Sequence, residues 1–459
     1  MKRTTPARRP AGSVLAVLCV CLALTAGGRA RAGNLAAALR QALATSPLIH
    51  AARARLRATT AALSAARSGH DPRIDLEGSV GRSHWSGASF LFPAFPTLSA
   101  SQYSYGVTVT QPIYQGGRVQ AAVGAARDTV AATLASYRGA EAHLLYDAAA
   151  AYARLYLAKA VVTLEQHNRA TLRQRLRNVT DALRNGEATR TDVSEARARL
   201  EQADAQLISA RGRANEAAAF YREIVGRRPP HRLLPPAPLG AAPRTLVQAQ
   251  ALADENFEVL EARFSRRVAR HRAREVGSGF YPRLALSGGY IRARNPEYGF
   301  TKFNSAMIAL QIDYPIYSGG ETLAREHEAR EELRASRAEL RGAQRAARAQ
   351  ATAAWMGYLS RRAEIRAYAS QVRAEIRAYK GVVVEHRVGT RTFLDVLNAE
   401  QELLDARVAL VRARVDAVLA RFRLQESAGL LTPFAVLGDG RPQRFPLRPK
   451  TARRTHDPS

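Results

Sequence analysis

Two stretches of the chain each contain a pair of segments in which apolar and polar residues alternate. Tyrosine and valine alternate with serine, glycine and threonine over residues 103–109, and residues 305–312 show the same period of two. Alternating segments also precede each of these, beginning near Ile74 and Leu284. A period of two places the apolar side chains on one face of a β-strand and the polar side chains on the other. We therefore expect four strands, two at about 72–114 and two at about 282–317.

The alternation is consistent with two environments for the apolar face of these strands. It would meet a protein core in a globular sandwich, or lipid in a membrane barrel whose polar face lines water. The following segments favour the barrel, because residues 117–183 and 320–386 are rich in Ala, Arg, Glu and Leu with few helix breakers. A helix of that length spans about 100 Å, and it exceeds the ordinary limit of about 25 residues more than twofold.

Each long helix is followed by a short break and a return helix. In the second return helix, apolar residues from Leu397 to Phe422 are spaced 7, 4, 3, 4, 3 and 4 apart. That spacing has the period of 3.5 that is typical of a coiled coil. The first return helix shows the same pattern more weakly, with many alanines that allow close helix approach.

The two halves of the chain repeat one another. Residues 111–117 read Gln-Pro-Ile-Tyr-Gln-Gly-Gly and residues 314–320 read Tyr-Pro-Ile-Tyr-Ser-Gly-Gly, an offset of 203 residues. Pro72 and Pro282 begin matching segments at an offset of 210, so one copy carries a loop seven residues longer. The chain is therefore a tandem duplication of a unit of about 200 residues.

The predicted organisation follows from this repeat. The fold class is mainly α with a membrane β-barrel, built from a duplicated helix–strand–strand–helix–helix unit whose long helices form a coiled-coil α-barrel. We expect the following segments: a signal peptide at 1–32; a first repeat at 33–228 with its hairpin tip at 184–190; a proline-rich linker at 229–243; a second repeat at 244–430 with its tip at 387–391; and a basic, proline-rich tail at 431–459.

The beginning of the chain resembles an export signal. It has a basic start, an apolar run from Val14 to Ala26, and a small-residue cleavage site at 30–32. Both cysteines, Cys19 and Cys21, lie in it, and neither follows the small residue that lipidation requires. Export also argues against nucleic acid as a partner, despite a formal net charge of +30.

Catalytic chemistry has almost no support in the sequence. The ten histidines show no metal-ligand spacing, and nucleophile-elbow, P-loop and dinucleotide-binding motifs do not occur. We expect no cofactor and no enzyme activity. Four strands cannot close a membrane barrel, for which eight is the practical minimum, so several chains would have to share one.

The motifs resemble those of the TolC-like outer-membrane channel-tunnels. The resemblance rests on the Pro-Ile-Tyr-x-Gly-Gly corners, on the order of the duplicated elements and on the segment Val-Gly-Thr-Arg-Thr-Phe-Leu-Asp-Val-Leu at 388–397. It covers about 33–433. It implies a homotrimer with a shared 12-stranded barrel in outer-membrane lipid and a helical tunnel through the periplasm. The implied partners are a periplasmic adaptor (a membrane fusion protein) and an inner-membrane ABC transporter or proton-driven pump.

The resemblance also assigns residue roles. Asp395 matches an aspartate at the periplasmic constriction, and Asn398 replaces the family's second aspartate. Arg391 matches a tethering arginine, and Thr191 and Asp192 match its partner pair in the first copy. Asp192 is also assigned to the periplasmic constriction, and His386 stands where the family has a tyrosine. A histidine changes charge near neutral pH, so it would make the tether sensitive to pH. The predicted strand-to-helix corners are Tyr114, Gly116, Gly117, Tyr317, Gly319 and Gly320.

Each assignment has a plainer alternative. Asp192 and Asp395 would also serve as helix N-terminal acids, which the helix dipole favours. Arg391 would then be one of many solvated arginines. The two corner tyrosines would either lie at the membrane interface or only pack against the corner, and the corner glycines would only permit the strand-to-helix turns.

Three functions remain open at this point. The absence of a lipidation cysteine and the Gly-Thr-Arg-Thr tip favour the exit duct of a type I secretion system. The alternatives are the outer-membrane component of a multidrug efflux pump and, more distantly, a periplasmic coiled-coil adaptor or scaffold.

Overall fold

The computed structural model describes residues 34–85, 98–294 and 302–438. The expected signal peptide, and all of the expected tail beyond residue 438, lie outside these residues. Contacts divide the described chain into two compact units. The first comprises 34–42, 148–237 and 370–415, and the second comprises 43–85, 98–147, 238–294, 302–369 and 416–438.

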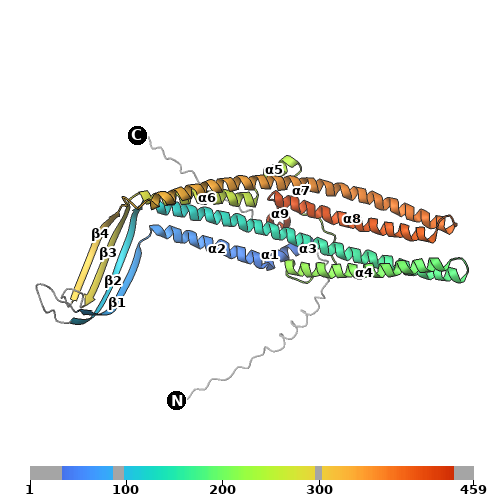
Figure 1. Ribbon diagram of the computed structural model, residues 1–459, viewed down its shortest axis with the longest axis horizontal. Coiled ribbons are helices and arrows are strands. Elements are labelled where there is room, and N and C mark those ends of the chain that lie inside the picture. The colour runs from blue at the N-terminus through green and yellow to red at the C-terminus, as the bar shows by residue number, and fades with distance from the viewer. Residues whose placement is uncertain (1–33, 86–97, 295–301, 439–459) are drawn as a thin grey trace, which may run out of the picture. The chain divides into compact units, whose positions relative to one another are not determined.

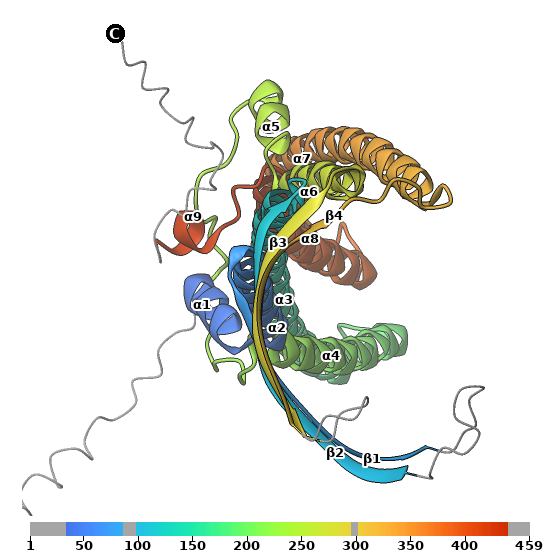
Figure 2. The same ribbon diagram turned by 90° about the vertical axis from the view of Figure 1, so that its left-hand side faces the viewer.

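Four antiparallel strands in the second unit form one curved sheet (Figure 2). The strands are β1 (Arg73–Trp85), β2 (Leu98–Gln115), β3 (Arg283–Arg294) and β4 (Lys302–Asp313), in the order β1-β2-β3-β4. The two copies of the repeat each supply a hairpin, and β2 joins them by pairing with β3. The strands of both copies therefore belong to a single sheet.

The register gives this sheet one apolar face. Ile74 lies opposite Val109 and Leu76 lies opposite Val107, and residues directly opposite in an antiparallel pair point to the same side. Ile308 on β4 belongs to the same face, and its side chain is 83% exposed. We call this side the apolar face. The other side, which we call the polar face, carries the acidic residues and many Ser, Thr and Gly, together with some apolar residues such as Ile291 and Met307.

The two copies differ where their strands end. In β2 the segment Pro112–Tyr114 remains in the ladder, with a register shift at that point, whereas β4 ends at Asp313. The predicted end of this strand at about 317 is therefore wrong by four residues. The reason is pairing. Residues 111–115 of β2 pair with β3, whereas the equivalent residues after Asp313 have no strand to pair with, because the described chain places none on the outer side of β4.

The helices follow the predicted repeat closely (Figure 1). The long helices α3 (Arg118–Arg184) and α7 (Glu321–Arg387) have 67 residues each, and they are followed by α4 (Arg190–Val225) and α8 (Phe393–Ser427). No helix in the described ranges has the length and hydropathy needed to cross a membrane. The remaining helices are α1 (Leu35–Thr45), α2 (Pro47–Arg67), α5 (Leu246–Ala253), α6 (Phe257–Gly277) and the short α9 (Pro433–Leu437), with 3₁₀ turns η1 (Ser68–His70) and η2 (Ser278–Phe280) before β1 and β3.

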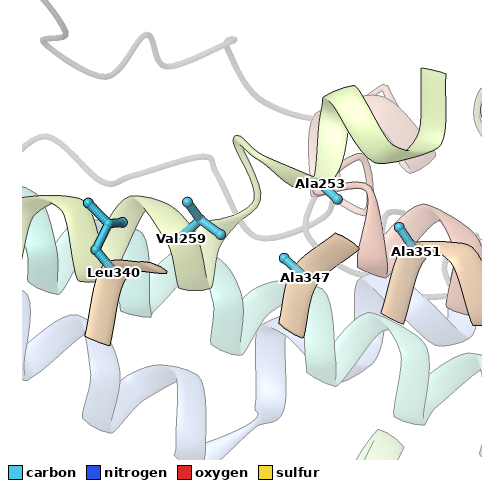
Figure 3. Packing of buried hydrophobic residues seen from close by; sticks show 5 residues of the cluster. All are labelled: Ala253, Val259, Leu340, Ala347 and Ala351. Atoms are coloured by element: carbon cyan, nitrogen blue, oxygen red, sulfur yellow. The ribbon is translucent and has the colours of Figure 1, made fainter. Parts of the chain in front are cut away.

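Alanine at the seams lets the helices pack closely. In the second unit, Ala347 and Ala351 of α7 are fully buried and contact a cluster that includes Val259 of α6 and Ala253 of α5 (Figure 3). The first unit has a comparable contact among Leu172, Ala203 and Leu397, which come from α3, α4 and α8. Small side chains shorten the distance between helix axes, so the buried seam is thin and extends along the helices.

The proline-rich linker is held by side chains of the helices. In the first unit the Tyr152 hydroxyl donates to the Leu234 carbonyl at 2.7 Å, and Lys159 donates to the Pro230 carbonyl at 3.1 Å. Burial raises the pKa of Tyr152 to about 12. In the second unit the buried Gln425 amide donates to the carbonyls of Leu239 and Ala241. These bonds satisfy linker carbonyls that have no helical or sheet partner.

Candidate functional site: the ends of the helical hairpins

Both hairpin ends lie in the first unit and are built in the same way. The first occupies 185–189 and the second occupies 388–392. The last residue of each end is a threonine that caps the return helix, and an aspartate stands three residues further on. This Thr-x-x-Asp spacing is a capping box, in which the two residues satisfy each other's backbone donors.

The two predicted aspartates are the acids of these capping boxes. The Asp192 carboxylate accepts from the Thr189 backbone N–H at 2.8 Å. The Asp395 carboxylate likewise accepts from the Thr392 N–H at 2.9 Å and from its hydroxyl at 2.8 Å. The Thr392 N–H is the main reason that the pKa of Asp395 is lowered. The structure therefore shows the helix-capping role for both residues.

The predicted tether residues make contacts within their own hairpin end. Arg391 Nε lies 3.2 Å from Glu385 Oε2, and the His386 ring is 3.1 Å from the Arg391 carbonyl. The His386 ring also lies 5.9 Å from the Phe393 ring, centroid to centroid. Thr191 is exposed in the first turn of α4. The ion pair recorded for Arg391 thus joins α7 to the tip loop that follows it.

A cavity of about 450 Å³ collects three of the predicted residues, namely Asp192, His386 and Arg391. Its wall also includes Arg175 and Phe393, so both hairpins contribute to it. Three other predicted residues, Thr191, Asp395 and Asn398, are not part of its wall as the described residues define it.

The sequence pattern did not predict several contacts of this site. Asn398 accepts a hydrogen bond from Arg199 at 2.6 Å, which links α8 to α4. Arg175 of α3 donates to the Tyr379 hydroxyl of α7 at 2.7 Å and lies 3.7 Å from the Glu400 carboxylate of α8. Burial raises the pKa of Glu400, and the Arg175 charge opposes that shift. Arg175 was hard to find because arginine is abundant throughout the chain.

A second buried acid of the first unit is Glu165 on α3. Its Oε2 has no hydrogen-bond partner among the described residues, and its side chain is almost fully buried. Burial raises the pKa of Glu165, with a further contribution from the charge of Asp405. Because a buried carboxylate oxygen without a hydrogen-bond partner is costly, we expect this position to weaken the helix seam at neutral pH.

The predicted corners lie in the second unit. Gly116 and Gly319 occupy equivalent positions with φ of 59° and 62°, in the region that favours glycine. A Cβ on Gly116 would lie 2.8 Å from the Ser278 carbonyl oxygen, whereas a Cβ on Gly319 would meet no atom within 4 Å. The adjoining glycines, Gly117 and Gly320, also have positive φ. Tyr114 pairs opposite Leu284 on the apolar face, and Tyr317 lies beyond β4 and is 87% exposed.

No metal centre was expected. Among the residues that the structure describes, no group of three or more His, Cys, Asp or Glu side chains is arranged to hold a metal ion.

The comparisons with known proteins agree with this architecture. The chain is 28% identical over 410 residues to the outer membrane efflux protein BepC of Brucella suis, covering 88% of this chain and 87% of BepC. It is 30% identical over 306 residues to the alkaline protease secretion protein AprF of Pseudomonas aeruginosa, covering 64% of this chain and 63% of AprF. Among solved structures, it superposes on CusC with a TM-score of 0.76 at 17% identity, covering 87% of this chain and 92% of CusC.

The crystal structure of VceC from Vibrio cholerae superposes with a TM-score of 0.73 at 21% identity, covering 86% of this chain and 96% of VceC. These likenesses confirm the predicted fold of long coiled-coil helices with four antiparallel strands in a duplicated unit. The sequence profile described as outer membrane efflux protein matches residues 38–227 and 249–430, which is most of both repeats. The chain therefore belongs to the outer membrane efflux protein family, whose members are transport channels of the outer membrane and not enzymes.

Proposed function

We propose that three copies of this chain form one channel-tunnel, the exit duct of a type I protein secretion system. The observation that carries the proposal is the sheet. It has an exposed apolar face and an unpaired strand at each edge of the described sheet, and four strands are too few to close around water. Three sheets joined edge to edge would give 12 strands, with the apolar faces toward lipid and the polar faces toward the lumen.

The helices would continue this duct through the periplasm. In a three-fold assembly the hairpin ends of all three copies lie around one axis, so Asp395 would occur three times around the opening. Three carboxylates around one axis concentrate cations and deter anions. The capping bonds of Asp395 hold its carboxylate at the start of α8, so the same geometry would fix the position of the ring.

Conductance measurements test this proposal. The purified protein in a planar lipid bilayer should conduct ions with a preference for cations. Asp395→Asn should retain the capping acceptor and reduce that preference, and Asp192→Asn tests whether the equivalent aspartate at the other hairpin end contributes to it as well. Failure of the purified protein to conduct would refute the duct, and unchanged selectivity in Asp395→Asn would refute the ring.

The proposed pH sensitivity of the tip is tested in the same bilayers. Conductance of the wild-type protein should change between pH 5 and pH 8, and His386→Phe should remove the change, because phenylalanine retains the ring contact with Phe393 without the charge. Parallel curves for the two proteins would exclude His386 as the sensor.

Two machines would use such a duct. The similarity to AprF, together with the Gly-Thr-Arg-Thr tip, supports secretion driven by an inner-membrane ABC transporter through a periplasmic adaptor. The similarity to BepC, which covers more of the chain, supports a second candidate, multidrug efflux with a proton-driven pump. Deleting the gene separates them: loss of a secreted protein from the medium supports secretion, and greater sensitivity to drugs with unchanged secretion supports efflux.

A further inference from the structure

The charges of the sheet are divided between its two faces. All three carboxylates of the described strands, Asp75, Glu77 and Asp313, project from the polar face, according to the register. The apolar face carries four cations at the end of the sheet that is remote from the helices. These cations are Arg82, Arg292, Arg294 and Lys302.

Three of these cations lie close together. Tyr103, Arg294 and Lys302 are directly opposite one another on β2, β3 and β4, and Arg292 is two residues along β3 on the same face. Neighbouring strands are about 4.8 Å apart, and alternate residues of one strand are about 6.8 Å apart, so the three charges fit within about 10 Å. The Arg294 guanidinium donates to the Tyr103 hydroxyl at 3.2 Å, which fixes its direction across the strands.

An apolar depression adjoins the cations on the same face. It has a volume of about 620 Å³ and lies over Gly288 and Ala306, between the side chains of Val109, Tyr290 and Ile308. The depression exists because two small residues stand between larger ones. A Cβ on Gly288 would meet no atom closer than 3.7 Å, so a side chain fits there.

We propose that the distal end of the apolar face binds a phosphorylated lipid, with the phosphate on Arg292, Arg294 and Lys302 and an acyl chain over Gly288. The proposal rests on the proposed membrane insertion, which directs the apolar face to lipid and the distal end of the sheet to the outer leaflet. Charge complementarity selects the lipid, because the described part of this face holds cations and no carboxylate beside the depression.

Several features of the sheet agree with this occupant. Tyr103 and Tyr105 lie level with Arg294 and Arg292, and Tyr290 lies between these cations and the aliphatic part of the face, so all three tyrosines stand where aromatic side chains occur at a membrane interface. Pairing of β1 and β4 with neighbouring copies would use strand edges and leave this face open. Arginine is also suited to phosphate, because its planar donors engage two oxygens at once.

Native mass spectrometry of the purified full-length protein with diphosphoryl lipid A tests the proposal, with phosphatidylcholine as the neutral comparison. Each cation near an anionic lipid strengthens binding about fivefold, so the triple substitution Arg292→Gln, Arg294→Gln and Lys302→Gln should weaken lipid A binding roughly a hundredfold. The double substitution Arg73→Gln and Arg283→Gln removes cations from the polar face and is the matched control. It should leave lipid A binding unchanged.

Filling the depression is an independent test. Gly288→Leu should weaken retention of lipid A while leaving all the cations in place. Equal lipid A binding by the triple variant and the wild type would overturn the proposal, and so would equal binding of phosphatidylcholine and lipid A by the wild type. Conductance of the same proteins in phosphatidylcholine bilayers distinguishes failure of the lipid site from failure of the duct. A wild-type protein that does not conduct would refute the duct. Variants that all conduct and all retain lipid A would refute only the lipid site.

Discussion

Tyr379→Phe removes one atom from the contact that joins the long helices near the hairpin ends. The lost hydroxyl accepts a hydrogen bond from Arg175 at 2.7 Å, and Arg175 keeps its second contact with Glu400. A hydrogen bond to a charged group contributes about 1.5–3 kcal/mol. The Arg175 side chain is 25% exposed, so water replaces part of the bond, and we expect a loss of about 1–2 kcal/mol.

Hydrogen–deuterium exchange measures this loss locally. Since 1.4 kcal/mol corresponds to a factor of ten, amides of residues 176–184 and 380–387 should exchange roughly five to thirty times faster in Tyr379→Phe. Tyr368→Phe is the matched control, because Tyr368 is a half-buried tyrosine of the same helix whose hydroxyl has no hydrogen bond within the described chain. Exchange in Tyr379→Phe that stays within about twofold of the wild type would refute the reasoning.

Three further substitutions have defined outcomes. Glu165→Gln should raise the free energy of unfolding by roughly 1 kcal/mol at pH 7. Because the pKa of Glu165 is raised in the folded chain, this advantage of the variant should vanish as the pH falls below the ordinary value of 4.5. Denaturant titrations at several pH values would show it. Asp395→Ala should destabilise the start of α8, measured as faster exchange of its first-turn amides. Because the pKa of Asp395 is lowered, the wild-type advantage is present above the ordinary value of 3.8 and is lost as the pH falls through the lowered pKa. Gly116→Ala should lower the thermal transition more than Gly319→Ala, since both add backbone strain and only the first brings a Cβ against a carbonyl; equal transitions would contradict the close approach.

The sequence predicted the long helices almost to the residue. Paired glycines precede each long helix, and Gly186 and Gly389 follow them, so local conformational preference alone marks the ends. The period-two segments likewise placed the apolar and polar sides of the strands. Local sequence is informative here because each element is long and its pattern is uninterrupted.

Contacts between distant segments were not predictable in the same way. The segment Pro-Ile-Tyr is identical in both copies, yet it is strand at 112–114 and lies outside a strand at 315–317. Only the presence of a pairing partner distinguishes them. The contacts Arg175–Tyr379 and Arg199–Asn398 join residues about 200 positions apart, and no periodicity relates such pairs. The tip motif identified which residues gather at the hairpin ends, but their partners depend on how the helices pack.

The open margins of the sheet constrain how the protein reaches its destination. Within the described chain, β1 and β4 each have a partner on one side only, so a row of backbone N–H and C=O groups is unbonded on each margin. In hydrocarbon each such group costs several kcal/mol, which a lone copy has no means to offset. In the proposed channel, insertion and association would therefore be coupled, because pairing with neighbouring copies is what satisfies the backbone groups on these margins.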